Sequence, residues 1–242
     1  MMFNKRKNVN NPCVDTAVIL AAGLGMRLRN TVADRPKGFV RLGNLPIIEE
    51  SLQRLYHAGV KKVIIITGYQ PTFYEALGAR YAGLQTVHNA EYAVSGSLYS
   101  LYCARQQIEG DFLLLESDLV YEYRAIEELL RVEARDVLLM SGPTGAGDEV
   151  FVETRNGNLC MMSKDVKRLN RVDGELVGIS RISHGFFREM IEIAKRRFVE
   201  TLHLDYETDG FIAAARQRDM LCHKIEGLIW CEIDDQTHLR RA

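Results

Sequence analysis

The sequence lacks the features that mark membrane, secreted and zinc-binding proteins. None of its apolar stretches is long enough to cross a membrane, and no apolar segment follows the basic first residues as it would in a secretory signal. The five cysteines are scattered and form no C-x-x-C pair, which argues against zinc or redox use. Basic and acidic residues balance, 31 against 32, so no whole-chain charge favours nucleic acid. We therefore expect a reduced, cytoplasmic protein that neither binds nucleic acid nor inserts into a membrane.

The length suits one large domain. Of the 242 residues, 47% are hydrophobic, which is enough for a substantial core without metals or disulfides. We find no internal repeat, linker or low-complexity segment. The sequence predicts a single domain over residues 15–242, preceded by a polar extension over residues 1–14. The oligomeric state is left open, with a homodimer as one option.

Short apolar segments alternate with helical patterns through the first half, which predicts an α/β fold with a mostly parallel sheet covered on both faces. The expected strands are Ala17–Ala22, Val63–Thr67, Gln85–His88, Phe112–Glu116 and Val137–Met140. The expected helices are Ile47–Ala58, Thr72–Tyr81, Ser97–Ile108 and Tyr123–Val132. Ligands of such sheets lie at the carboxyl ends of the strands, so the segments that follow strands should converge on one cleft.

The second half predicts additional strands and a small β-rich lid over about residues 141–182. Asn156-Gly157 is a strong hairpin signal between the expected strands Glu149–Thr154 and Leu159–Lys164. The remaining expected elements are a strand at Glu175–Ile182, helices at Gly185–Arg197 and Tyr206–Gln217, and a final strand pair at Leu221–Lys224 and Leu228–Ile233.

A glycine-rich loop follows the first strand. Gly23 and Gly25 end the apolar run, Arg27 follows two residues later, and Lys37 stands behind Pro36. A dinucleotide-binding fingerprint would need glycine where Leu28 stands, and a P-loop would need Lys-Ser or Lys-Thr in place of Met26-Arg27. A loop of backbone N–H groups with two added cations is suited to a triphosphate.

Acidic residues end two distant strands. Glu116 and Asp118 follow one apolar strand, and Asp234 or Asp235 follows another; Glu232 should point to the face opposite Ile233. Mg²⁺ prefers oxygen ligands from one or two carboxylates together with phosphates. The two strand ends therefore predict one metal site, although an acid at such a position can also be a helix cap.

Three other segments carry candidate side chains with structural alternatives. The small polar stretch from Asn89 to Ser97 could read a nucleobase edge, or Ser95 or Ser97 could cap the next helix. Lys164 could reach an acceptor phosphate from the lid or lie in solvent. The acids in Asp205-Tyr206-Glu207 could bind an amine or simply begin a helix.

Several of these motifs together resemble the sugar-phosphate-type nucleotidyltransferases, and among them the cytidylyltransferases of small amino-alcohol phosphates or phosphonates. The resemblance covers nearly the whole chain after about residue 15. It rests on L-A-A-G-L-G-M-R-L, R-P-K-G, Gly68-Tyr69, Asn89 with Tyr92, Ser117-Asp118 and E-I-D at Asp234. The implied fold is a single-domain, Rossmann-like nucleotidyltransferase fold with a mixed sheet.

The resemblance implies roles for the matching residues. It assigns Mg²⁺ to Asp118 and Asp234, and cytosine recognition to Gly96 and Ser97. The catalytic cations would be Arg27, Lys37 and Lys164. The nucleotide site would comprise Leu20, Ala22, Gly23, Gly25, Asn89, Gly96, Ser97 and Glu116. The acceptor site would comprise Glu153, Lys164, Asp205, Tyr206 and Glu207. Met26 departs from the usual Ser or Thr, so a hydroxyl contact to phosphate is not expected there.

The expected reaction transfers CMP from CTP to 2-aminoethylphosphonate and releases pyrophosphate. A primary ammonium has three donors and needs carboxylates, whereas a quaternary ammonium needs an aromatic cage. The acids at residues 205 and 207 favour the primary amine. Phosphocholine, phosphoethanolamine or a sugar 1-phosphate as acceptor stays open, as does a non-catalytic nucleotide-sensing subunit.

Overall fold

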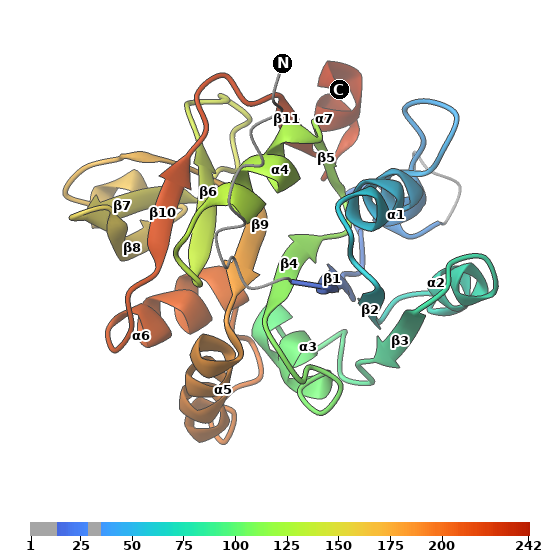
Figure 1. Ribbon diagram of the computed structural model, residues 1–242, viewed down its shortest axis with the longest axis horizontal. Coiled ribbons are helices and arrows are strands. Elements are labelled where there is room, and N and C mark those ends of the chain that lie inside the picture. The colour runs from blue at the N-terminus through green and yellow to red at the C-terminus, as the bar shows by residue number, and fades with distance from the viewer. Residues whose placement is uncertain (1–13, 29–34) are drawn as a thin grey trace, which may run out of the picture.

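The computed structural model describes residues 14–28 and 35–242; the expected extension over residues 1–14 therefore lies almost wholly outside the described residues. Within the described residues, nine strands form one mixed sheet in the order β3-β2-β1-β4-β9-β6-β10-β8-β7 (Figure 1). The strands β3, β2, β1 and β4 run parallel, and β9 runs antiparallel to both β4 and β6. This architecture confirms the predicted Rossmann-like α/β fold.

The elements fall into one large sheet, one small sheet and the helices. The large sheet contains β1 (Thr16–Ala21), β2 (Lys62–Thr67), β3 (Leu84–His88), β4 (Phe112–Glu116), β6 (Val137–Ser141), β7 (Phe151–Arg155), β8 (Asn158–Ser163), β9 (Gly174–Ile182) and β10 (Leu221–Lys224). The small antiparallel sheet pairs β5 (Leu119–Tyr121) with β11 (Trp230–Glu232). The helices are α1 (Ile47–His57), α2 (Thr72–Glu75), α3 (Ser97–Cys103), α4 (Arg124–Arg131), α5 (His184–Arg197), α6 (Ile212–Ala215) and α7 (Gln236–Arg241).

The central strands of the large sheet are buried on both faces, because helices cover each face (Figure 1). Alternate residues of the central strands enter different cores: Val18 packs with α3 and α5, whereas Ile19 packs with α1 and α4. The strands therefore read as nearly continuous apolar runs. The polar residues that follow each run are left at the strand ends.

Local sequence explains where the main helices begin and end. Pro46 precedes α1, Glu49 and Glu50 lie in its first turn, and Gly59 follows it with φ of +96°. Proline and acids favour a helix start, and a glycine with positive φ favours its end. In α5 the Ser183 side chain accepts the Phe186 N–H, which caps the helix.

The predicted hairpin is confirmed. Asn156 and Gly157 have φ of +52° and +80° and join β7 to β8 in a two-residue turn, as a type I′ hairpin requires. The predicted final strand pair is wrong, because β10 pairs with β6 and β8, whereas β11 pairs with β5 in the other sheet. The sequence interpretation also missed β5.

Two predicted helices are shorter and less regular than expected. The α2 helix continues only as a 3₁₀ turn over Ala76–Ala79, and α6 is preceded by a π-helical segment over Tyr206–Phe211.

None of the helices in residues 14–28 and 35–242 combines the length and apolar character needed to span a membrane. The four cysteines in these ranges are unpaired and half-buried.

Gly68 brings the end of β2 against the loop that follows β1. A Cβ atom at this position would lie 2.4 Å from the Ala22 carbonyl oxygen and 2.5 Å from the Tyr92 Cβ. Both distances are shorter than van der Waals contact allows. Only glycine therefore permits this approach of β2 to the two segments around the cleft.

We predict that Gly68→Ala lowers the free energy of unfolding by about 1–3 kcal/mol, because the added methyl forces the backbone of residue 22 to move. Urea denaturation measures this loss. Gly110→Ala is the matched control, since its Cβ would meet nothing within 4 Å, and its effect should stay within about 0.5 kcal/mol. Equal stabilities of the two variants would contradict the close approach.

Candidate active site

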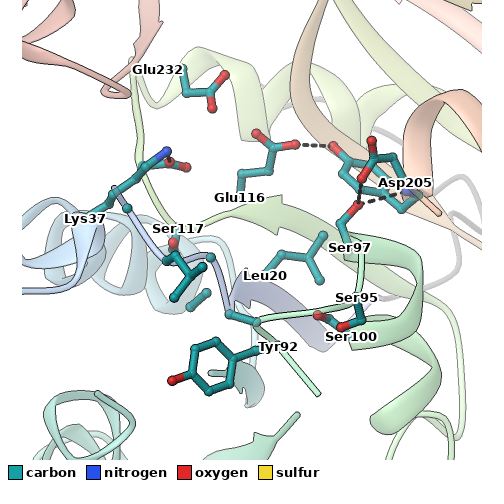
Figure 2. A pocket seen from close by; sticks show the side chains of 18 of the residues that line it. Leu20, Lys37, Tyr92, Ser95, Ser97, Ser100, Glu116, Ser117, Asp205 and Glu232 are labelled. Carbon is teal, nitrogen blue, oxygen red and sulfur yellow. Dashed lines mark hydrogen bonds and ion pairs between the residues drawn. The ribbon is translucent and has the colours of Figure 1, made fainter. Parts of the chain in front are cut away.

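A cleft of about 390 Å³ opens at the carboxyl ends of β1 and β4 (Figure 2). The loop after β1, the start of α3 and the π-helical segment border it. Among the residues assigned from the sequence, the lining includes Leu20, Ala22, Gly23, Gly25, Arg27, Lys37, Gly96, Ser97, Glu116, Asp118, Lys164, Asp205, Tyr206 and Glu207. The strand-end segments thus converge as the parallel topology predicts.

The glycine loop lies along the Lys37 side chain. Gly25 has φ of +59°, and a Cβ there would lie 3.2 Å from the Lys37 Cγ. A larger residue would therefore be strained and would crowd the lysine. Residues 29–34, between Arg27 and Lys37 in sequence, lie outside the described ranges.

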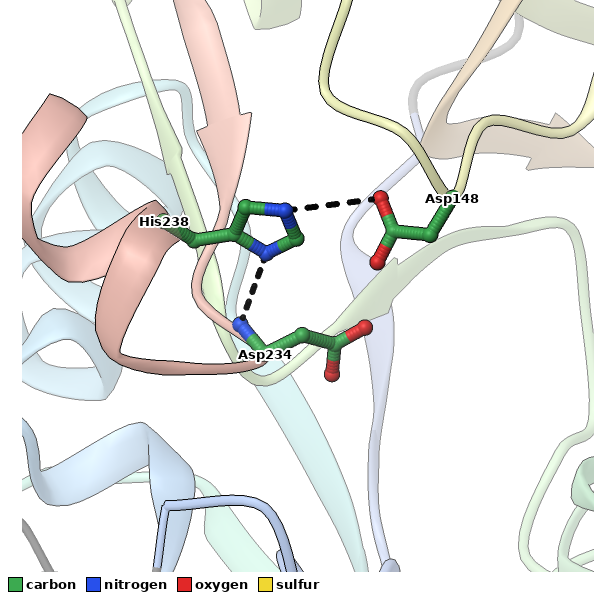
Figure 3. A group of neighbouring side chains, drawn as sticks. All are labelled: Asp148, Asp234 and His238. Carbon is green, nitrogen blue, oxygen red and sulfur yellow. Dashed lines mark hydrogen bonds and ion pairs between the residues drawn. The ribbon is translucent and has the colours of Figure 1, made fainter.

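The structure separates Asp234 from Asp235, which the sequence left equivalent. Asp235 caps α7 by accepting the N–H groups of Thr237 and His238 at 2.7 and 3.0 Å. The Asp234 N–H instead faces the ring of His238 (Figure 3), and its carboxylate accepts hydrogen bonds from Arg27 and Lys37. Asp234 is therefore the residue of this pair that faces the cations of the glycine loop.

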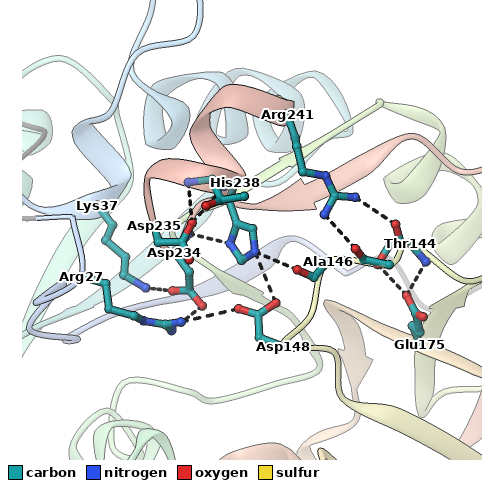
Figure 4. Close-up of polar contacts among 12 residues, drawn as sticks. Arg27, Lys37, Thr144, Ala146, Asp148, Glu175, Asp234, Asp235, His238 and Arg241 are labelled. Carbon is teal, nitrogen blue, oxygen red and sulfur yellow. Dashed lines mark hydrogen bonds and ion pairs between the residues drawn. The ribbon is translucent and has the colours of Figure 1, made fainter.

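Lys37 joins the two predicted metal ligands. Its ammonium donates to Asp118 Oδ2 at 3.0 Å and also to Asp234 Oδ1 (Figure 4). Arg27 Nη2 donates to Asp234 Oδ2 at 2.7 Å, and its Nη1 lies 3.8 Å from Asp148 Oδ2. The expected phosphate-binding cations are thus paired with the expected metal-binding acids.

This pairing sets the charge states of the two partners. Burial disfavours the Lys37 ammonium, but Asp118 and Asp234 outweigh it and raise the pKa of Lys37. Burial likewise opposes ionisation of Asp234, but Lys37 outweighs it and holds the pKa of Asp234 at about 2. Lysine and aspartate are therefore both ionised throughout the neutral range.

A second acidic group surrounds Asp118. Carboxylate oxygens of Glu116, Asp118 and Glu232 lie within 4.8 Å of one another. Burial, then the charge of Asp118, raises the pKa of Glu116 to about 8; burial, then the charge of Glu116, raises the pKa of Glu232 to about 10. Such a group holds protons at neutral pH and could exchange them for a cation.

Glu232 was not assigned to the site from the sequence, although a signal for it was present. Side chains alternate along a strand, so Glu232 shares a face with Asp234 and opposes Ile233. In the structure Ile233 is buried in a small apolar cluster, and Glu232 lines the cleft. The predicted alternation of Glu232 and Ile233 is confirmed. This alternation alone could have placed the Glu232 carboxylate on the side of the cleft.

The stretch before α3 contributes backbone and hydroxyl groups. The α3 helix has no side-chain cap at Gly96, so the alternative of a serine cap is wrong. The Ser97 hydroxyl accepts the Tyr206 N–H at 2.9 Å and joins α3 to the π-helical segment. Asn89 is fully buried behind the cleft, where its amide donates to Ser95 and Ser100 at 3.0 Å.

The π-helical segment delivers Tyr206 and Glu207. The Tyr206 hydroxyl donates to Glu116 Oε1 at 2.6 Å. Glu207 is buried, and its Oε2 has no hydrogen-bond partner within the described residues. Burial, then the charge of Asp205, raises the pKa of Glu207 to about 7, and nearby Lys164 opposes the shift. A π-helical turn inside a helix is frequent at functional sites.

A second cavity of about 490 Å³ adjoins the cleft. Glu116, Lys164, Glu207 and Glu232 line both spaces. The second cavity is further lined by Tyr121, Trp230 and residues of the glycine-rich segment 142–149. Glu207 and Lys164 therefore lie where a nucleotide and a second ligand could meet.

One predicted acceptor residue is not brought to either space. Glu153 lies on β7, lines neither cavity, and accepts the Asn170 backbone and side-chain N–H groups at 2.9 and 3.0 Å. Its carboxylate ties β7 to the loop that precedes β9. Asp148 and His238 do reach the site, and no sequence pattern singled them out.

Comparisons with known proteins identify a matching family and several relatives. The profile of the MobA-like NTP transferase domain family matches residues 17–177. The chain is 29% identical over 239 residues to the CMP-5'-(3-aminopropyl)phosphonate synthase of Streptomyces rubellomurinus, covering 93% of this chain and 38% of that protein. It is 33% identical over 105 residues to the 2-aminoethylphosphonate cytidylyltransferase of Lancefieldella rimae, covering 43% of each protein.

The chain thus spans less than half the length of these two curated relatives. Among solved structures, the inositol-1-phosphate CTP transferase from T. maritima superposes with a TM-score of 0.78, covering 93% of this chain and 91% of that chain. At 19% identity, this likeness shows the fold alone.

We predict that stability falls as pH rises from about 5.5 to about 8.5 in a chelating buffer. The raised pKa values of Glu116 and Glu232 mean that the folded chain keeps protons that the unfolded chain loses above its ordinary glutamate pKa. The free energy of unfolding falls with rising pH wherever the folded state binds more protons than the unfolded state. Glu232→Gln should make this slope shallower by at most about 1.4 kcal/mol per pH unit, as urea denaturation can measure.

Glu153→Gln is the control, because the bonds from Asn170 lower the pKa of Glu153 and keep its titration below this range. An unchanged slope in Glu232→Gln would show that Glu232 is ionised in the folded chain.

Proposed function

The chain belongs to the family of MobA-like NTP transferase domains and is a nucleotidyltransferase, and we propose that it transfers CMP from CTP to 2-aminoethylphosphonate. Pyrophosphate is the second product. The observation that carries the proposal is the Lys37 ammonium between Asp118 and Asp234, at the end of a glycine loop. The names of the two phosphonate-linked relatives support CTP and an aminoalkyl phosphonate as the substrates.

A triphosphate gives Lys37 and Arg27 better partners than they have in the free protein. Phosphate oxygens carry more charge than the carboxylates, and the loop adds backbone N–H donors. Turning toward the phosphates would free Asp118 and Asp234 from their cations. Nucleotide binding therefore exposes two acids beside the phosphates.

Those two acids fit Mg²⁺. They share one cation in the free protein, and Glu232 and Glu116 add oxygen atoms beside Asp118. Mg²⁺ takes oxygen ligands and is commonly held by one or two carboxylates plus substrate phosphates. We assign it to Asp118 and Asp234, with Glu232 next to them. When bound, the ion would neutralise charge on the phosphates.

The chain's own residues would position and stabilise the reaction without a general base. A phosphonate oxygen of the acceptor is anionic near neutral pH, so it can attack the α-phosphorus directly while the bond to pyrophosphate breaks. Arg27 and Lys37 would stabilise the charge that grows on pyrophosphate. Lys164, at the border of both cavities, would hold the attacking phosphonate.

Glu207 supports an acceptor with a primary ammonium. It is a buried carboxylate with an unpartnered oxygen, and a partner is needed to offset the cost of desolvation. An ammonium with three N–H donors can pair with it and with the exposed carboxylate of Asp205. The position at the junction of the cavities matches an acceptor that reaches the nucleotide from the second cavity.

Phosphocholine is the second candidate acceptor because two aromatic side chains line the second cavity. Tyr121 and Trp230 come from the paired strands β5 and β11. Aromatic faces attract a quaternary ammonium that has no N–H to donate. The acceptor comparison below separates the two candidates.

We predict that Asp234→Asn lowers kcat at least about 100-fold, because it removes a charge that holds both the cation and the metal. Asp235→Asn is the adjacent control; its side chain keeps an oxygen to cap α7, so its kcat should stay within about twofold. Pyrophosphate release with CTP measures both variants. Circular dichroism confirms that each variant is folded. Equal rates for the two variants would remove Asp234 from the site.

We predict that 2-aminoethylphosphonate reacts faster than phosphoethanolamine and phosphocholine, and that CTP is preferred over ATP, GTP and UTP. In Glu207→Gln the KM for 2-aminoethylphosphonate should rise about 10- to 100-fold, since a charged hydrogen bond is lost. The KM for CTP should not change. A clear preference for phosphocholine, unaffected by Glu207→Gln, would select the aromatic alternative.

A further inference from the structure

The glycine-rich segment 142–149 is bonded to α7, which lies beside it (Figure 4). Arg241 donates through Nη1 to the Gly145 carbonyl at 3.0 Å and through Nη2 to the Thr144 carbonyl at 2.9 Å. On the other side, the N–H and hydroxyl of Thr144 donate to Glu175 Oε2 at 2.8 and 2.7 Å. A segment with three glycines, which has high conformational freedom, is thus fixed from two sides.

His238 lies between this segment and Asp234 (Figure 3). Its Nδ1 is 3.4 Å from the Asp234 backbone nitrogen, and its Nε2 is 3.4 Å from the Ala146 carbonyl oxygen and 3.7 Å from Asp148 Oδ1. A backbone N–H can only donate, so Nδ1 must accept. A carbonyl can only accept, so Nε2 must carry the proton.

The two ends of the ring act on different parts of the site. On the Nδ1 side, Asp234 holds Lys37 and Arg27. On the Nε2 side, the backbone of the bonded segment forms a wall of the second cavity, which Thr144, Ala146 and Asp148 line. His238 itself is buried, so its ring has a fixed place between them.

We propose that His238 is a positioning residue with two separable effects. Its Nδ1 holds the turn that directs the Asp234 carboxylate toward Lys37 and Arg27. Its Nε2–H, together with Arg241, holds the wall of the cavity that receives the acceptor. The assignment of the two effects to metal and acceptor rests on the proposed function. Side chains that orient a metal-binding carboxylate commonly change metal affinity or activity about 10- to 100-fold when they are replaced.

Two substitutions of His238 each keep the hydrogen-bonding group of one ring nitrogen and remove that of the other. Gln at position 238 can extend an amide N–H to the place of Nε2 but offers no acceptor at the place of Nδ1. Asn can offer its carbonyl oxygen near the place of Nδ1 but is too short to reach the segment. Arg241→Ala removes bonds to the segment alone, and Arg241→Lys should restore part of what it removes.

The first measurement is Mn²⁺ binding to the full chain by electron paramagnetic resonance, without any substrate. We expect His238→Gln to weaken Mn²⁺ binding about 10- to 100-fold, whereas His238→Asn and Arg241→Ala stay within about twofold. The control is His223→Ala, because the His223 ring lines neither cavity and interacts with Glu128 at 3.3 Å. Unchanged Mn²⁺ affinity in His238→Gln would overturn the Nδ1 effect.

The second measurement is the KM for the best acceptor of the rate comparison. His238→Asn and Arg241→Ala should raise it about 10-fold or more with kcat nearly unchanged, while His238→Gln lowers kcat instead. Equal loss of Mn²⁺ affinity and of melting temperature in all three variants would show a merely structural role and overturn the proposal. If the wild-type chain transfers no CMP, the proposed function fails, but the Mn²⁺ series still tests His238.

Discussion

The ammonium of Lys37 between Asp118 and Asp234 is the interaction that assembles the cleft. The three residues come from the segment after the glycine loop, the end of β4 and the end of β11, which are far apart in sequence. Around them, Glu116 and Glu232 add two further acids. Without the ammonium between them, the carboxylates of Asp118 and Asp234 would be two like charges held close together in a poorly hydrated space.

The positive charges of Lys37 and Arg27 are therefore balanced by the negative charges of Asp118 and Asp234. Each cation proposed to bind phosphate is paired with an acid proposed to bind the metal. Under the proposed function, the nucleotide draws the cations away and leaves the acids to the metal, and the metal in turn releases the cations to the nucleotide. Two ligands that prepare each other's sites bind with positive coupling, and that coupling is reciprocal. Under this proposal, Lys37 compensates the charge of Asp118 and Asp234 until the ion binds.

Sequence patterns were most informative where local constraints decide the structure. The alternating cores of β1, the caps of α1 and α5 and the Asn156-Gly157 turn follow from neighbouring residues. The cleft at the strand ends follows from parallel topology. The nucleotidyltransferase resemblance is confirmed by the family match over residues 17–177.

Long-range pairing limited the rest of the prediction. Nothing near β11 reveals that it leaves β10 and joins β5. This pairing carries Glu232 to the cleft and Asp234 to Lys37. The π-helical form of Tyr206–Phe211 depends on packing between α3 and α5 rather than on propensity. Glu153 was expected at the acceptor site, but its carboxylate is bonded to Asn170, and no local sequence pattern reveals this neighbour.

The small sheet has a consequence for the integrity of the site. β5 and β11 are joined over three residue pairs, and a two-stranded ribbon of this length has little stability of its own. Detachment of β11 from β5 breaks these three pairs, so it costs less free energy than unfolding of the nine-stranded sheet. Opening would remove Glu232 and Asp234 while the large core remains intact. Loss of the site and global unfolding are then two separate equilibria. On heating, the protein can therefore lose activity below the temperature at which it unfolds cooperatively.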